Sequence, residues 1–215
     1  MRAFPARSTS DINAINNSGD CAFSQSCFNG LTEIVDSLLK APKLDVNLKN
    51  KNGDSGLYLA CFKKHIEVSL LLIEQCESKN IDINAINNLG DNAFYQACLN
   101  GLTEVVDKFL KAPAFRYTPT RNIHGNTEFH QASSHGHIEI IRLLLQASDI
   151  RLISQGFLWS CEIGNAELTR NLLNESDIKG IDVYLNFLGS AYDNSTIDLT
   201  MAEGGGFAIE ITVTK

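Results

Sequence analysis

The sequence predicts an all-α solenoid built from short tandem units, and three observations support this fold class. First, residues 11–42 recur as residues 82–113, with 24 of 32 positions identical at an offset of 71. Second, glycines mark successive units at intervals of 34, 37 and 35 residues, at Gly19, Gly53, Gly90 and Gly125. Third, the apolar residues of each unit follow helical spacing. Self-similarity at a period near 35 residues is typical of stacked repeats.

Each unit opens with an Asn-x-x-Gly turn and continues into two helices. Asn and Gly tolerate the positive φ that a tight reversal requires. A short helix of small and apolar residues follows, and a second helix begins after a break near residues 30, 64, 101 and 136. The second helix has apolar pairs four residues apart, which form one face that a neighbour must cover. These pairs are Ile34, Val35, Leu38 and Leu39; Val105, Val106, Phe109 and Leu110; and Ile140, Ile141, Leu144 and Leu145.

The repeat boundaries divide the chain into a repeat array and two flanking segments. We expect repeats over residues 11–177, with full units at about 11–45, 46–81, 82–117 and 118–148 and a reduced fifth unit at 149–177. Residues 1–10 are an N-terminal lead-in, and residues 178–215 form a C-terminal cap and a short irregular tail. Residues 207–213 alternate in hydrophobicity, which predicts a strand. This strand either pairs with residues near 196–200, pairs with another chain, or stays disordered.

The fourth unit carries a resemblance to a known family. It reads Asn-Ile-His-Gly-Asn-Thr-Glu-Phe-His-Gln-Ala over residues 122–132, followed by Gly136-His137. This is similar to the D-x-x-G-x-T-P-L-H-x-A and G-H signatures of ankyrin repeats. The other full units depart from the T-P-L-H tetrapeptide, and no unit has its Pro, which pre-sets the first helical turn. We therefore expect lower stability than in a regular array. The irregular, Asn- and Ile-rich units also resemble ankyrin proteins that intracellular bacteria deliver into host cells.

The resemblance implies a non-catalytic module that binds a partner protein on a concave face. Hairpin tips and the exposed ends of the first helices form that face in the family. Phe28, Phe62 and Leu99 share one repeat position there, and they form either an apolar strip for a partner or additional core. The residues expected to bind the partner are Phe28, Phe62, Leu99, Asn17, Asp20, Lys51, Asp54, Leu89, Asp91, His124, Asn126 and His135.

Cysteine and histidine are explained by the repeat register rather than by a metal or a disulfide. Cys27, Cys61, Cys98 and Cys161 hold the same repeat position in four of the five units. Packed helices lie about 8–10 Å apart, farther than a disulfide can bridge, so we expect small apolar fillers at this position. No C-x-x-C motif occurs. The resemblance implies that His130 and His137 bond to the backbone and that His135 lies on the surface. We expect no metal and no cofactor.

Composition and charge disfavour several classes of partner. The 215 residues include 18 Lys and Arg against 25 Asp and Glu, a net charge of −7, which disfavours nucleic acid and anionic membranes. No stretch has the roughly 18 apolar residues of a spanning helix. We expect a monomer that is cytoplasmic or translocated into a host cell. Two alternatives stay open: an enzyme or toxin with chemistry near the C-terminal tail and the repeats as its scaffold, and a self-associating structural unit.

Overall fold

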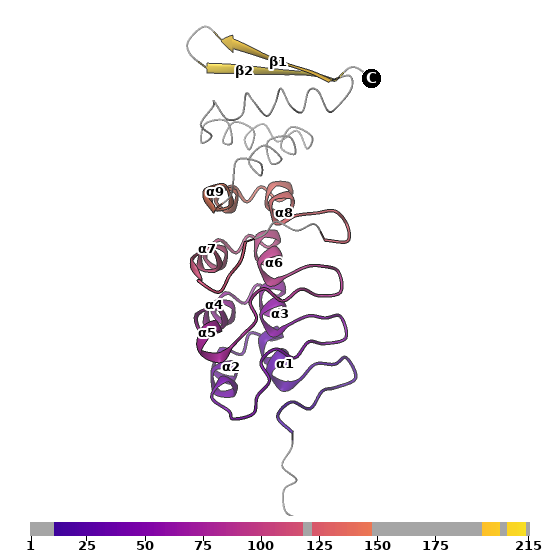
Figure 1. Cartoon of the computed structure of the whole chain (residues 1–215), viewed down its shortest axis with the longest axis vertical. Coiled ribbons are helices and arrows are strands. Elements are labelled where there is room, and N and C mark those ends of the chain that lie inside the picture. The colour runs from indigo at the N-terminus through magenta and orange to yellow at the C-terminus, as the bar shows by residue number, and fades with distance from the viewer. Residues whose placement is uncertain (1–10, 118–121, 148–194, 203–205, 214–215) are drawn as a thin grey trace, which may run out of the picture. The chain divides into compact units, whose positions relative to one another are not determined.

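The structure, a computed structural model, describes residues 11–117, 122–147, 195–202 and 206–213 (Figure 1). The chain divides into two compact units, Met1–Ala147 and Ser148–Lys215, and each is described by itself. The expected lead-in at residues 1–10, the reduced fifth unit at 149–177 and the segment 178–194 lie outside the described residues.

The first compact unit is a stack of helix pairs, which confirms the predicted all-α solenoid. Figure 1 shows the first helices of the pairs in one column and the second helices in another, with hairpin loops extending from the first-helix side. Each first helix contacts the next first helix, and each second helix contacts the next second helix. The first helices are α1 (Ala22–Phe28), α3 (Gly56–Phe62), α6 (Ala93–Leu99) and α8 (Glu128–Ser134); the second helices are α2 (Thr32–Leu39), α4 (Ile66–Glu74), α7 (Thr103–Lys111) and α9 (Ile138–Ala147), and the single turn α5 (Cys76–Lys79) follows α4.

The Asn-x-x-Gly turns fold as the sequence predicts. In the second unit, Asn50 Oδ1 accepts the backbone N–H groups of Asn52 and Asp54, both at 3.0 Å. Gly53 closes this turn with a φ of +81°, a conformation that a side chain disfavours. The same pair of bonds recurs at Asn16, Asn87 and Asn122.

Polar side chains cap the first helices even where the Thr of the T-P-L-H tetrapeptide is absent. Ser55 Oγ accepts the N–H of Tyr58 at 3.2 Å, and Asn92 Oδ1 accepts the N–H of Tyr95 at 2.7 Å. A cap of this kind contributes about 1 kcal/mol to helix stability. The substituted units therefore keep a defined start for their first helices.

The core lies between the two helix columns and between successive units. Phe23, Phe94 and Phe109 are its largest fully buried side chains. Cys27, Cys61 and Cys98 are completely buried, which confirms the expected filler positions, whereas Cys161 lies outside the described residues. Tight packing of small thiols suits the close approach of neighbouring first helices.

One predicted core position differs in the first unit. The side chain of Ile34 is 48% exposed, whereas Val68, Val105 and Ile140 at the same repeat position are fully buried. In the later repeats the second helix packs against the second helix of the preceding unit, whereas the described residues contain no unit ahead of the first. Helical spacing alone does not distinguish these two situations.

The second compact unit contains a β-hairpin. Strand β1 (Ser195–Ala202) pairs antiparallel with β2 (Gly206–Val213), in a register that places Thr196 opposite Thr212 and Met201 opposite Phe207. The predicted strand at residues 207–213 is thus confirmed. Of the three outcomes left open by the sequence, the structure has the strand paired back on the segment near residues 196–200.

Candidate protein-binding groove

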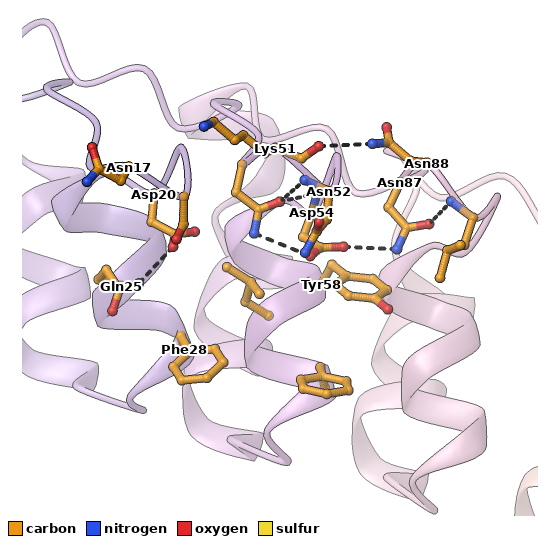
Figure 2. A pocket seen from close by; sticks show the side chains of 15 residues that line it. Asn17, Asp20, Gln25, Phe28, Lys51, Asn52, Asp54, Tyr58, Asn87 and Asn88 are labelled. Carbon is orange, nitrogen blue, oxygen red and sulfur yellow. Dashed lines mark hydrogen bonds between the residues drawn. The ribbon is translucent and has the colours of Figure 1, made fainter.

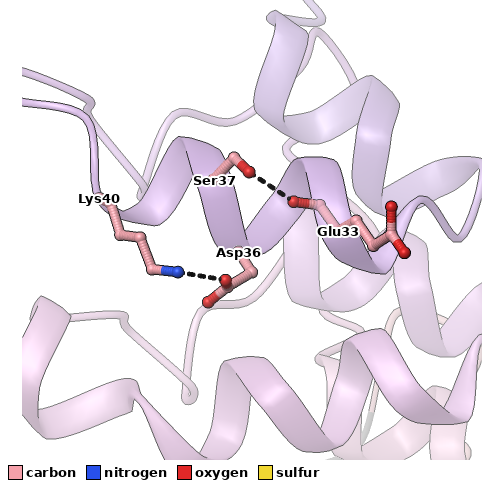
Figure 3. A network of polar contacts seen from close by, with 4 residues as sticks. All are labelled: Glu33, Asp36, Ser37 and Lys40. Carbon is pink, nitrogen blue, oxygen red and sulfur yellow. Dashed lines mark hydrogen bonds and ion pairs between the residues drawn. The ribbon is translucent and has the colours of Figure 1, made fainter.

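A groove runs along the hairpins of the first three units and the first helices of the first two, α1 and α3. Its volume is about 720 Å³. Figure 2 shows Asp20, Gln25 and Phe28 on the side of the first unit, with Lys51, Asp54 and Tyr58 across from them. We call this feature the groove; it is lined by Asn17, Ser18, Asp20, Gln25, Phe28, Asn50, Lys51, Asn52, Asp54, Tyr58, Leu59, Phe62, Asn87, Asn88 and Leu89.

Apolar side chains at the ends of α1 and α3 form one wall of the groove. Phe62 is 48% exposed and Phe28 is half-buried. The ring of Phe62 stacks on Tyr58, one helical turn earlier, with ring centroids 6.3 Å apart. Lys63 Nζ lies 4.6 Å from the ring centroid of Phe28 and 5.6 Å from that of Phe62, so one ammonium group bridges the two rings. Two neighbouring units therefore present a joint aromatic surface to the groove.

The expected apolar strip is shorter than the repeat register suggests. Phe28 and Phe62 line the groove together, but Leu99 is half-buried and lies outside its lining. Leu89, from the third hairpin tip, is 43% exposed and lines the groove instead. The apolar surface is thus formed by two helix ends and one hairpin tip.

The polar residues expected at the hairpin tips include both exposed and buried side chains, a difference that their repeat positions do not predict. Asn17 and Lys51 are exposed and line the groove. Asp54 and Asp91 are only 7% and 6% exposed. Each of these two carboxylates accepts a 2.9 Å hydrogen bond from the turn asparagine of the next unit: Asn87 donates to Asp54, and Asn122 donates to Asp91. Their main role in the structure is to join successive units.

The remaining candidates lie at the fourth unit, outside the groove lining. His124 and His135 are exposed, and Asn126 is half-buried. His135 Nδ1 lies 2.9 Å from the main-chain oxygen of Gln131 in its own helix. The groove is therefore a feature of the first three units.

Eight groove residues are absent from the expected binding residues. Ser18, Asn52 and Asn88 lie at the hairpin tips that the resemblance assigns to the binding face, whereas sequence reasoning missed Gln25, Asn50, Tyr58, Leu59 and Asn87. Tyr58 recurs as Tyr95 at the same repeat position, and it lies four residues before Phe62, so a helical-face argument would have placed it beside Phe62. Asn50 and Asn87 were interpreted as turn residues only. Turn residues line the groove because the hairpin loops extend beside the first helices (Figure 1).

Histidine contacts in the fourth unit follow the expected structural roles. His137 Nε2 lies 3.2 Å from the main-chain oxygen of Leu99, and the backbone N–H of Thr127 donates to His130 Nδ1 at 3.4 Å. Within the described residues, no group of three or more His, Cys, Asp or Glu side chains is close enough to hold a metal ion. In the same part of the chain, no helix is long and apolar enough to cross a bilayer.

The stacked helix pairs, projecting hairpins and lateral groove define a helical-repeat protein of the kind that presents an extended surface. A family model described as ankyrin repeats (3 copies) matches residues 23–117 and 76–155, which together cover more than half of the chain. The chain belongs to the ankyrin-repeat family. Repeats of this family generally mediate protein–protein interaction and are typically non-catalytic.

Proposed function

We propose that this protein is a non-catalytic interaction module that holds a partner polypeptide in the groove. The observation that carries the proposal is the exposure of Phe62 beside Phe28 and Leu89 in one hollow of the surface. Burial of an exposed aromatic ring by a partner is favourable, because apolar surface is removed from water. Such anchors contribute most of the energy in protein interfaces.

The exposed tip residues extend this contact surface. Asn17, Asn52 and Asn88 project from successive hairpins along the groove. Their amides donate and accept hydrogen bonds, so they suit a partner backbone or polar side chains. On this proposal the partner spans at least three units.

Delivery into a host cell, which the composition of the units led us to expect, would make a host protein the natural partner. The proposal applies unchanged to a partner from the same cell, because it depends only on the groove. A eukaryotic host lysate is therefore the first source in which to search.

The test compares two equally exposed apolar residues. Phe62→Ser removes the ring from the groove, and Ile34→Ser removes a side chain of the same 48% exposure from the second-helix column. Partners captured by the full chain should be lost with Phe62→Ser, by roughly tenfold or more, and retained with Ile34→Ser. Circular dichroism should be unchanged in both variants. Retention of the same partners by Phe62→Ser, or equal loss with Ile34→Ser, would contradict the proposal.

A further inference from the structure

The interfaces between successive units are not equivalent, and the difference lies at the groove. Between the second and third units, Asn87 Nδ2 donates to Asp54 Oδ1 at 2.9 Å, and Gln96 Nε2 donates to the hydroxyl of Tyr58 at 3.0 Å. Between the third and fourth units, Asn122 Nδ2 donates both to Asp91 Oδ1 at 2.9 Å and to the hydroxyl of Tyr95 at 3.2 Å. In these two interfaces a carboxylate and a tyrosine of one unit accept from the next.

Neither bond forms between the first and second units. Asn50 Nδ2 donates to Asp54 of its own unit, at 3.3 Å, instead of to Asp20. The tyrosine position holds Ser24 in the first unit, and the glutamine position holds Leu59 in the second. Backbone contact between the two tips is nevertheless kept, because Lys51 N donates to Ser18 O at 3.0 Å. The units are therefore joined normally at the tips while their side-chain contacts below are missing.

The missing contacts leave the Asp20 carboxylate available. Asp20 Oδ2 accepts one bond, from Gln25 Nε2 at 3.0 Å, and within the described part of the chain Asp20 Oδ1 has no hydrogen-bond partner. Asp20 is half-buried and lines the groove, whereas the equivalent Asp54 and Asp91 are buried. A half-buried carboxylate with a free oxygen is a favourable partner for a cation.

The apolar wall lies at a fixed distance from this carboxylate. Asp20 lies eight residues before Phe28, so a helix rise of about 1.5 Å per residue separates their backbones by roughly 12 Å along the axis. An extended chain advances about 3.3 Å per residue, so residues three apart in a ligand span roughly 10 Å, and a long side chain on one of them covers the difference. The net charge of −7 also attracts a cationic partner.

We propose that the partner segment inserts an arginine that pairs with Asp20 and, three residues away, an apolar side chain that packs on Phe28 and Phe62. This inference rests on the proposed function and adds the chemistry of its ligand. Arginine fits better than lysine, because its planar guanidinium can bond Asp20 while its stem packs along the groove.

The test uses defined hexapeptides added to the isotope-labelled full chain and followed by NMR. The probes are Ala-Arg-Ala-Ala-Leu-Ala and its reversed order, with matched versions in which citrulline or glutamate replaces arginine. The arginine probe in one of the two orders should shift the amide signals of groove residues and bind about tenfold more tightly than its citrulline version. Equal binding of the citrulline or glutamate probes, shifts located outside the groove, or no shifts at all would overturn the inference.

Variants of the chain assign the effect to Asp20. Asp20→Asn should weaken the arginine probe to the level of the citrulline probe, whereas Glu33→Gln, which removes an exposed carboxylate from α2, should not. Ser24→Tyr combined with Leu59→Gln restores the side chains of the later interfaces and should abolish probe binding by filling the groove. Asp20→Asn with unchanged arginine binding would overturn the assignment even if the filled variant fails to fold.

The outcomes separate this inference from the proposed function. Suppose that a captured partner is lost with Phe62→Ser but that the citrulline and arginine probes bind equally. This result would support the proposed interaction module and contradict the role of Asp20. If the Phe62→Ser variant captures the same partners as the wild type, the proposed interaction module is contradicted, whichever peptide probes bind.

Discussion

The imidazole of His65 extends from the second unit to the first, where its Nε2 lies 3.0 Å from the main-chain oxygen of Phe28. The ring occupies space beside Gly30: a Cβ built on Gly30 would lie 2.4 Å from His65 Nδ1. His137 repeats this arrangement over Gly101, whose added Cβ would lie 2.7 Å from the ring. Glycine at these breaks therefore serves both the backbone conformation and the packing between units.

This relationship predicts unequal effects of two similar substitutions. Gly30 and Gly136 have nearly the same φ, +69° and +68°, but among the residues that the structure describes a Cβ at Gly136 would meet nothing within 4 Å. Gly136→Ala should cost about 1–2 kcal/mol from backbone strain alone. Gly30→Ala should cost about 1–3 kcal/mol more, because the His65 ring must move. Urea unfolding of both variants measures the difference, and equal losses of stability would contradict it.

The polar contacts between units predict a second asymmetry. Asn87 and Asn16 both accept two backbone N–H groups in their own turns, but Asn87 also donates to the buried Asp54. Asn87→Ala should therefore lower the free energy of unfolding by about 1.5–3 kcal/mol more than Asn16→Ala. Denaturant titrations of the two variants test this. If Asn16→Ala were as damaging as Asn87→Ala, the bond between units would contribute nothing measurable.

A buried carboxylate predicts a pH dependence of stability in the fourth unit. The side chain of Glu128 is 2% exposed, and burial, with a smaller contribution from Asp91, raises the pKa of Glu128 to about 7. Burial also raises the pKa of Asp91 above its ordinary value. Because these carboxyl groups bind protons more tightly in the folded state than in the unfolded state, the contribution of Glu128 to stability is fully present below about pH 4.5 and is lost as the pH rises through about 7.

Glu128→Gln should remove most of this dependence. The variant should unfold at a higher urea concentration than the wild type at pH 8, by about 2–3 kcal/mol in free energy, and the gap should narrow toward pH 5. Glu139→Gln, an exposed glutamate in the neighbouring helix α9, is the matched control. If the difference in free energy of unfolding between Glu128→Gln and the wild type were the same at pH 5 and pH 8, Glu128 would have the same pKa in the folded and unfolded states, which contradicts the prediction.

The buried thiols predict slow chemical modification. Burial raises the pKa of Cys61 to about 12, and its side chain is fully covered, so little thiolate forms and reagents have no access. We expect Cys61 to resist an aromatic disulfide reagent at pH 8 until urea unfolds the array. Mass spectrometry of the modified peptides measures this, and labelling of Cys61 within minutes in the native state would contradict the packing described.

The repeat architecture was predictable from the sequence because period and spacing are local properties. Gly19 and Gly53 mark turns whatever their surroundings, and the paired apolar residues of the second helices must face a neighbour. The exposure of Ile34 was not predictable in this way, because it depends on whether a preceding unit covers it. The strand at residues 207–213 was predicted from alternation, and its choice of pairing partner came from the structure.

The candidate site was predictable only in part. Phe28, Phe62 and Leu89 share the groove as their positions suggested, yet Asp54 is covered by an asparagine of the next unit, although it occupies the same repeat position as Asp20. The difference arises from Ser24 and Leu59, which replace the residues that close the later interfaces. Substitutions within a repeat reveal such a site only when neighbouring interfaces are compared in three dimensions.

The central claim, that the groove holds the partner, is tested most directly by photo-crosslinking from inside it. The amino acid p-benzoylphenylalanine should replace Phe62 in one variant and Ile34 in another, because both positions are equally exposed. The account predicts a crosslinked partner from position 62 and none from position 34. Crosslinks from position 34 alone, or from both positions with equal yield, would contradict it.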